Sequence, residues 1–338
     1  MEITGPEKKI AFISTGGTIA MRFDPEKGGE VPSADAAELL ETIRDGIPSS
    51  LRLESIDYGN VPSFHLSPSI MLDLAGTIEE YLDRDDVDGV VLTHGTDTLE
   101  ETSYFLDLWI DTAKPVCLTG AMRSGSDLSP DGPANILAAL RAASCSELRE
   151  CGTLVVMNGE IHAARLACKL YRTAVHSFSS PGWGPLGRVS SEGITVRWKI
   201  LPEPKLRSKT PLRAVPIIKS YTGMEPSVFA SLLETGLGGL VVEGFGAGNV
   251  PPSIVPGIQR LLDENSPVVV TSRVPAGPLL GTYAAEGGGG HLRSLGAILC
   301  GELNSQKARI KLMLALGMSR DMGELRQIFT EPQTNYIA

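Results

Sequence analysis

Residues 88–102, DGVVLTHGTDTLEET, contain the pattern that decides the fold. The apolar run VVL at 90–92 predicts a buried strand, and a polar turn at 93–98 follows it directly. Glu100 and Glu101 come next, and acidic side chains favour the first turn of a helix because they complement its dipole. The segment therefore predicts a strand, a turn and a helix in succession. Its turn is unusually rich in reactive groups, with three threonines, a histidine and an aspartate.

The same succession recurs through the first half of the chain. Apolar runs predict strands at 9–15, 88–95, 114–120 and 152–160, and helical spacing predicts helices at 36–47, 67–83, 97–110 and 131–144. Ser67 and Pro68 are a typical cap and first residue for the second of these helices. Alternation of strands and helices at this spacing predicts a mostly parallel sheet with helices on both faces.

The pattern breaks around residues 193–212, where three prolines and a basic cluster predict a linker between domains. We therefore expect an N-terminal domain at 1–192 and a C-terminal domain at 213–338. Further strands are predicted at 213–221, 239–249 and 267–274, and a helix at 304–317. The expected fold class is α/β, with a larger N-terminal domain and a smaller C-terminal α/β domain.

The composition excludes several classes of partner. A net charge of −10 and a pI of about 5.1 argue against nucleic acid and anionic membranes, since both require a basic face. The five cysteines show no C-x-x-C pair, which favours free thiols over disulfides or a zinc site. No apolar run reaches the ~18 residues of a membrane span, and no signal-peptide pattern is present. We expect a soluble, cytoplasmic protein.

Two predicted strand ends each carry a threonine flanked by glycine, in STGGTIA at 14–20 and in HGTDT at 94–98. Ligands of open parallel sheets bind where the carboxyl ends of the strands converge, so these turns are candidate sites. A Gly-Gly pair lets backbone N–H groups approach an anion closely. The alternatives are a simple tight turn for the first motif and a helix N-cap by Asp97 or Thr98 for the second.

The two motifs together resemble the bacterial-type L-asparaginase/glutaminase family, a family of amidohydrolases with a threonine nucleophile. The similarity continues in order through KPVCLTGAMRSGSDLSPDGPANILAAL, VVMNGE, WGPLG, GAGN, SRVPAG and LNSQKARIKLMLAL, and so covers nearly the whole chain. It implies hydrolysis of the side-chain amide of L-asparagine to L-aspartate and ammonia.

The resemblance implies four catalytic residues. The nucleophile of the first motif matches Thr18, the threonine and aspartate of the second match Thr96 and Asp97, and a lysine after the MN strand matches Lys169. A threonine hydroxyl is a weak nucleophile that needs a base, and a desolvated lysine can serve as one. On residue type alone, Lys169 could equally be a solvated surface lysine.

The resemblance also implies the groups that bind the substrate. Ser63 matches the serine that holds the α-carboxylate, Thr96 and Asp97 contribute to binding, and Asn249 matches an asparagine supplied by a neighbouring subunit. The implied assembly is a homodimer or homotetramer with shared active sites. The resemblance implies no cofactor and no metal ion.

The sequence departs from the family pattern at three places. The family's loop tyrosine is missing and Glu30 stands at the matching position, while Phe64 and His65 stand where the commonest members have a polar residue and an aspartate. The segment after SRVPAG is longer, so Glu286 is only a possible match for the glutamate that binds the α-ammonium. We hypothesise that Glu30, His65 or Tyr283 supplies the missing contact.

Two alternative functions stay open at this point. The chain could be an amidohydrolase of another small amide, such as glutamine, a D-amino-acid amide or a peptide-terminal asparagine, and Phe64 beside Ser63 supports this possibility. It could also be a catalytically weak relative that binds a ligand without turnover, which the missing tyrosine supports.

Overall fold

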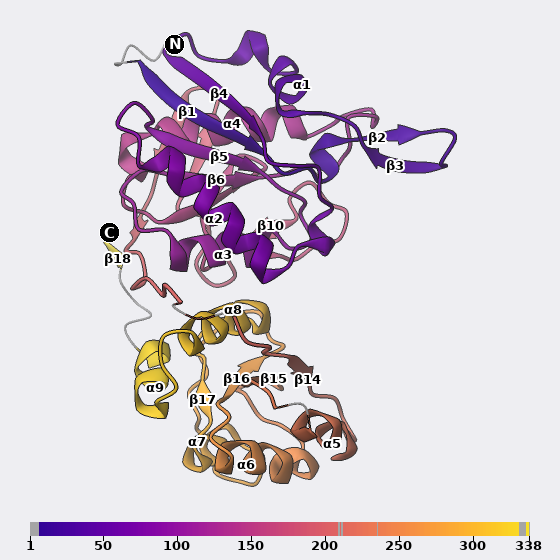
Figure 1. The fold of residues 1–338 in the computed structure, drawn as a ribbon, viewed down its shortest axis with the longest axis vertical. Helices are drawn as coiled ribbons and strands as arrows, with labels where there is room; N and C mark the ends of the chain where they lie inside the picture. The colour runs from indigo at the N-terminus through magenta and orange to yellow at the C-terminus, as the bar shows by residue number, and fades with distance from the viewer. Residues whose placement is uncertain (1–6, 209, 211, 235, 331–335, 338) are drawn as a thin grey trace. The chain divides into compact units, whose positions relative to one another are not determined.

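The computed structural model describes residues 7–208, 210, 212–234, 236–330 and 336–337. These residues form two compact units (Figure 1). Unit 1 contains the described residues up to Lys205 together with β18 (Tyr336–Ile337), and unit 2 contains the described residues from Leu206 to Thr330. Residues 193–205 of the predicted linker therefore lie within unit 1, because β12 (Gly193–Val196) pairs with the main sheet.

Unit 1 is built on an eight-stranded sheet in the order β12-β11-β8-β7-β6-β5-β1-β4. Five neighbouring strands are parallel to one another, whereas the pairs β7–β8, β8–β11 and β11–β12 are antiparallel, which confirms the mostly parallel sheet. The strands are β1 (Lys8–Ser14), β4 (Leu51–Asp57), β5 (Gly89–Thr93), β6 (Val116–Thr119), β7 (Thr153–Met157), β8 (Glu160–Ala163), β11 (Gly187–Ser190) and β12. Three small pairs accompany it: β2 (Met21–Asp24) with β3 (Gly29–Pro32), β9 (Cys168–Lys169) with β10 (Phe178–Ser179), and β13 (Lys199–Ile200) with β18.

Helices cover both faces of this sheet, as the alternation predicts. On one face, α1 (Ala36–Glu41) and α4 (Gly132–Ser144) bury apolar side chains against the strands. On the other face, α2 (Pro68–Leu82) and α3 (Leu99–Trp109) pack against each other. The helix predicted over 36–47 is shorter than expected, because α1 ends at Glu41 and a 3-10 turn, η2 (Arg44–Gly46), follows.

The α4 connection has the opposite hand to the other crossovers. The connections β5–α3–β6 and β6–α4–β7 advance in the same direction along the sheet, yet α3 and α4 lie on opposite faces. The connections through α1, α2 and α3 share one hand. Since nearly all such crossovers are right-handed, β6–α4–β7 is the left-handed exception.

Unit 2 has a four-stranded parallel sheet in the order β14-β15-β16-β17, which confirms the smaller α/β domain. Its strands are β14 (Ile217–Lys219), β15 (Leu240–Gly244), β16 (Val268–Ser272) and β17 (Ile298–Leu299), and its helices are α5 (Ser227–Glu234), α6 (Val255–Asp263), α7 (Gly289–Leu295), α8 (Ser305–Leu316) and α9 (Met322–Thr330). Asn304 caps α8, because its side chain accepts a hydrogen bond from the Lys307 N–H at 3.0 Å. Within the described residues, no helix combines the length and apolar character that a bilayer crossing requires.

Candidate active site

The two threonine turns lie side by side because their strands are neighbours. β1 pairs with β5 so that Ser14 lies opposite Thr93 at the carboxyl edge of the sheet. The Thr15 hydroxyl donates a 2.8 Å hydrogen bond to the Thr93 carbonyl, which joins the two strand ends. The chain after β4 reaches the same place, since the Val61 N–H donates to the Thr15 carbonyl at 2.9 Å. Three connections therefore converge at one edge of the sheet.

Glycine allows these turns to pack backbone against backbone. Gly17 has φ 89°, and a Cβ at this position would collide with the backbone of His94 and Gly95. A Cβ at Gly95 would lie 2.6 Å from the Ser63 hydroxyl oxygen. Any larger residue at either glycine would push the turns apart, so the glycines set the spacing between Thr18, Thr96 and Ser63.

These turns surround a cavity of about 170 Å³ in unit 1. Its walls bring together all five of the catalytic and substrate-binding residues predicted in this unit, together with one residue predicted as possible. The lining residues are Gly17, Thr18, Met21, Pro62, Ser63, Phe64, Gly95, Thr96, Asp97, Ala121, Met122, Lys169 and Arg172.

Lys169 makes two short contacts inside this cavity. Its ammonium nitrogen Nζ lies 2.7 Å from Thr96 Oγ1 and 2.7 Å from Asp97 Oδ1. The Lys169 side chain is 16% exposed, so it is not the solvated surface lysine that residue type alone allowed. Asp97 is more accessible, with a side chain 62% exposed, and its carboxylate can face a ligand as well as the lysine.

Glu100, on the first turn of α3, holds the backbone of Lys169 in place. It is 7% exposed, and its Oε2 atom accepts a hydrogen bond from the Lys169 N–H at 3.3 Å. A buried carboxylate that receives a backbone N–H anchors the strand that carries this group. Glu100 therefore connects β9 to α3, the helix that follows the Thr96 turn.

We expect Glu100→Ala to lower kcat for the amide hydrolysis that the resemblance implies by about tenfold or more, since Lys169 loses its backbone anchor. Glu100→Gln keeps an acceptor oxygen and should retain most of the rate. Steady-state ammonia release measures kcat and KM for both variants. Equal losses in the alanine and glutamine variants would contradict this positioning role.

The turn's helix cap differs from the expectation. Thr98 occupies the N-cap position of α3, but its side chain does not cap the helix. Its hydroxyl instead donates a 2.9 Å hydrogen bond to the Ser63 carbonyl. The residue expected to start the helix thus also fastens the Ser63 segment, which forms the 3-10 turn η3 (Ser63–His65), to the catalytic turn.

His94 is a structural residue of the turn. Its ring is fully buried, and its Nδ1–H donates a 2.7 Å hydrogen bond to the Gly95 carbonyl. Burial lowers the pKa of His94 to about 4, and this hydrogen bond opposes the shift only in part. The neutral ring therefore holds Gly95 rather than exchanging protons with a substrate.

The buried His94 should make unit 1 less stable in acid. Between about pH 4 and pH 6.5 the unfolded chain binds a proton at His94 that the native chain rejects, so stability falls as the pH decreases. We expect a loss of about 2 kcal/mol between pH 7.5 and pH 5 that His94→Gln abolishes. Urea unfolding followed by tryptophan fluorescence measures it, because all three tryptophans lie in unit 1. The same loss in both proteins would rule out His94 as its source.

The residues of unit 1 that were predicted as possible site residues are Glu30, Phe64 and His65. The Glu30 carboxylate accepts a 2.9 Å hydrogen bond from the Ser124 hydroxyl, and so attaches the β2–β3 hairpin to the segment after β6. Glu30 and His65 are absent from the cavity lining, and the His65 ring packs edge-on against Phe64. Phe64 lines the cavity although it is 65% exposed.

Three candidates lie in unit 2. The Asn249 Oδ1 atom accepts a hydrogen bond from the Gly289 N–H at 3.1 Å, and so holds the start of α7. Tyr283 and Glu286 are exposed in the segment before that helix. Their proposed roles toward the cavity of unit 1 stay predictions.

Arg172 is a charged cavity residue that sequence reasoning missed. It follows Lys169 by three positions in the loop between β9 and β10, and its side chain lines the cavity. The signal available was a second cation close to the predicted lysine. With Lys169 and Arg172 against Asp97, the charged groups of the lining sum to a positive charge, which favours a ligand that carries a carboxylate.

Comparison with known proteins agrees with this arrangement. Residues 9–202 match the family model for the asparaginase N-terminal domain, and residues 214–329 match that for the glutaminase/asparaginase C-terminal domain. A probable L-asparaginase of Deinococcus radiodurans is 37% identical over 329 residues, which are 96% of this chain and 97% of that protein. A glutaminase-asparaginase of Pseudomonas aeruginosa is 33% identical, and the match covers 96% of this chain and 92% of that protein.

A solved structure shares the whole architecture. The crystal structure of a probable cytoplasmic L-asparaginase from Campylobacter jejuni superposes with a TM-score of 0.85 at 33% identity, and the match covers 96% of this chain and 99% of that one. Both halves of the sequence, the fold and the paired threonine turns lead to one conclusion: this chain belongs to the asparaginase family.

Proposed function

We propose that this protein hydrolyses the side-chain amide of L-asparagine to L-aspartate and ammonia, with Thr18 as the nucleophile. One observation carries the proposal. Lys169 Nζ contacts Thr96 Oγ1 and Asp97 Oδ1 at 2.7 Å each, in a cavity that Thr18 and Ser63 also line. A nucleophile, a base with its orienting carboxylate and a polar group for substrate binding form the minimum set for acyl transfer.

The substrate itself can activate the base. In the free protein Lys169 Nζ pairs with Asp97 Oδ1 at 2.7 Å. A substrate α-ammonium that binds to Asp97 would place a second cation beside Lys169. Like charges disfavour each other, so this binding makes proton loss from Lys169 easier. The neutral amine can then accept a proton through Thr96 while the Thr18 oxygen attacks.

The reaction balances in two steps on the acyl-enzyme route. The Thr18 oxygen bonds to the amide carbon, the C–N bond breaks, and the nitrogen leaves as ammonia with the hydroxyl proton. Water then cleaves the ester, releases aspartate and restores the Thr18 hydroxyl. Backbone N–H groups of the Gly-rich turns would stabilise the oxyanion. Direct attack by water is the alternative, and trapping a Thr18 ester with hydroxylamine separates the two routes.

The proposal also covers the assembly of the protein, its location in the cell and its need for a cofactor. We propose a homodimer or homotetramer in which Asn249 of one subunit completes a neighbouring site, a cytoplasmic location and turnover without a cofactor. None of the five cysteines, all of which lie among the described residues, forms a disulfide, and this supports a reducing compartment. Analytical ultracentrifugation of the purified protein tests the assembly.

A second candidate is hydrolysis of another small amide, such as glutamine or a D-amino-acid amide. Phe64 and Arg172 in the cavity lining favour it, since they add an apolar surface and a cation beside Ser63.

A panel of small amides tests the proposed function. The purified protein should release ammonia from L-asparagine with a higher kcat/KM than from L-glutamine, D-asparagine or a peptide-terminal asparagine. A preference for any other member would favour the second candidate. Ammonia release from none of them would contradict both and favour a ligand-binding relative.

A further inference from the structure

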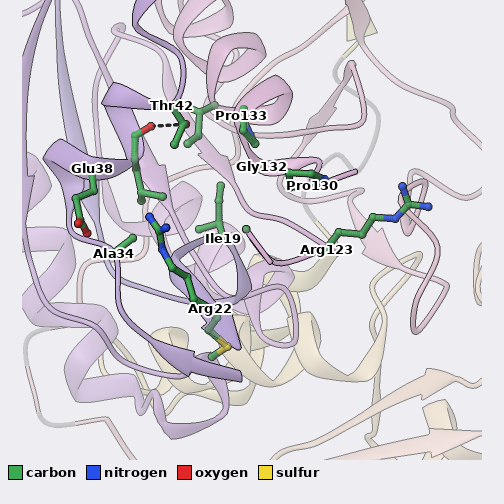
Figure 2. Close-up of a pocket in the computed structure, with 13 residues that line it drawn as sticks. Ile19, Arg22, Ala34, Glu38, Thr42, Arg123, Pro130, Gly132 and Pro133 are labelled. Carbon is green, nitrogen blue, oxygen red and sulfur yellow. Dashed lines mark hydrogen bonds between the residues drawn. The ribbon is translucent and has the colours of Figure 1, made fainter. Parts of the chain in front are cut away.

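Unit 1 contains a second cavity, of about 250 Å³, that the proposed reaction does not use (Figure 2). It lies between η1 (Thr18–Ala20), α1 and α4. Its volume is below the ~300–1,000 Å³ of pockets for drug-sized molecules, so it suits a ligand of about the size of an amino acid.

The floor of this cavity is apolar. Ile19, Leu39 and Ile136 line it, and these side chains are 6%, 4% and 0% exposed. Ala34 and Pro133 complete the apolar surface. An apolar group that enters this cavity would leave water and contact packed side chains, which is the main source of affinity in small-molecule sites.

Two opposite charges stand at the rim. The Arg22 guanidinium points into the cavity between Glu38 and Ile19, whereas Arg123 points away (Figure 2). Within the part of the chain that the structure describes, the Arg22 guanidinium has no hydrogen-bond or ion-pair partner, although the Arg22 backbone pairs with Val31 in the β2–β3 ladder. Glu38 uses one carboxylate oxygen to accept the Asp35 N–H at 3.1 Å in the capping box of α1, and this leaves its charge available to a ligand.

We propose that this cavity binds a free α-amino acid with a branched apolar side chain. Arg22 would pair with the carboxylate, for which a guanidinium offers two parallel donors, and Glu38 would pair with the ammonium. The apolar floor would receive the side chain. A simple fatty carboxylate fits less well because Glu38 would repel it, and the two opposite charges match a zwitterion.

The position of the cavity connects it to catalysis. Met21 lines both this cavity and the one that contains Thr18, and Ile19 directly follows Thr18 in the chain. A ligand that packs against Ile19 and Met21 restricts the motion of a wall of the catalytic cavity. Such preorganisation lowers the KM for L-asparagine.

Calorimetric titration tests the site without any turnover, so its result stands apart from the proposed function. L-leucine should bind the wild-type protein, whereas 4-methylpentanoate, which lacks the amine, and 3-methylbutylamine, which lacks the carboxylate, should bind at least about tenfold more weakly. Failure of L-leucine to bind, or equal affinity for all three, would overturn the proposal.

Three variants assign the contacts. Arg22→Gln should bind L-leucine at least about tenfold more weakly, while Arg44→Gln, an exposed control outside the cavity lining, should bind it like the wild type. Glu38→Gln keeps the capping-box acceptor but loses the charge, so it should bind L-leucine and 4-methylpentanoate equally. Equal affinities in the two arginine variants would overturn the role of Arg22.

Enzyme kinetics test the coupling between L-leucine binding in this cavity and the KM for L-asparagine. Saturating L-leucine should lower the KM for L-asparagine by about fivefold in the wild type and leave Arg22→Gln unchanged. An unchanged KM in the wild type would overturn the coupling. A raised KM in both proteins would show competition at the catalytic cavity and would overturn it as well.

Discussion

Thr18→Ala is expected to lower kcat on L-asparagine by about 10⁴-fold or more, since loss of a nucleophile removes the covalent step and leaves only binding and oxyanion stabilisation. Thr18 begins η1 at the wall of the catalytic cavity and is only partly buried. The substitution removes a hydroxyl and a methyl group from a partly buried position, so stability should change by no more than about 1 kcal/mol.

Thr18→Ser is the matched control for this prediction. It keeps the attacking oxygen and loses only a methyl group, and it should retain far more activity than the alanine variant. Ammonia release measures both rates, and thermal unfolding confirms that both variants fold. Full activity in Thr18→Ala would refute the assignment of the nucleophile.

Lys169→Met is expected to lower kcat by about 10²–10⁴-fold, the usual contribution of a positioned general base. Methionine has nearly the same length as lysine but makes neither of the 2.7 Å contacts to Thr96 Oγ1 and Asp97 Oδ1. The effect should appear in kcat more than in KM, because the base acts in the transition state rather than in substrate binding.

Lys169→Arg separates two roles for the cation. Arginine keeps the positive charge but cannot lose its proton, so it should be as inactive as methionine if Lys169 is a base. Recovery of activity in the arginine variant would show that only the charge matters. Lys27→Met is the control, since Lys27 is 71% exposed in the β2–β3 hairpin and does not line the catalytic cavity.

The strands of unit 1 that were predicted correctly share one physical property. β1, β5, β6 and β7 lie in the interior of the sheet, where both faces are covered, and they read as continuous apolar runs. The edge strand β4 mixes buried and exposed residues, and its sequence LRLESID shows no such run. The sequence analysis therefore missed it, together with the short strand β11 next to the other edge.

The residues of the candidate site also differ in whether a local sequence pattern marks them. Both threonine turns could be predicted because each follows an apolar run and carries its own glycines. The partner of Glu30 could not be predicted, because its hydrogen bond to Ser124 joins residues 94 positions apart. Met21 was missed because it reaches the cavity from β2, and no local pattern marks such a residue. For Arg172 the local signal was only a second cation three positions after Lys169.

The sequence by itself determined the order of strands and helices and the two glycine-flanked threonines, because apolar periodicity and glycine act over a few neighbouring residues. Only the tertiary structure decided which side chains meet. Lys169 reaches Thr96 and Asp97 because Glu100 anchors β9 to α3, and the two turns touch because β1 and β5 are neighbours in the sheet. These contacts depend on packing between segments more than 60 residues apart in the chain, and a local sequence pattern carries no record of such packing.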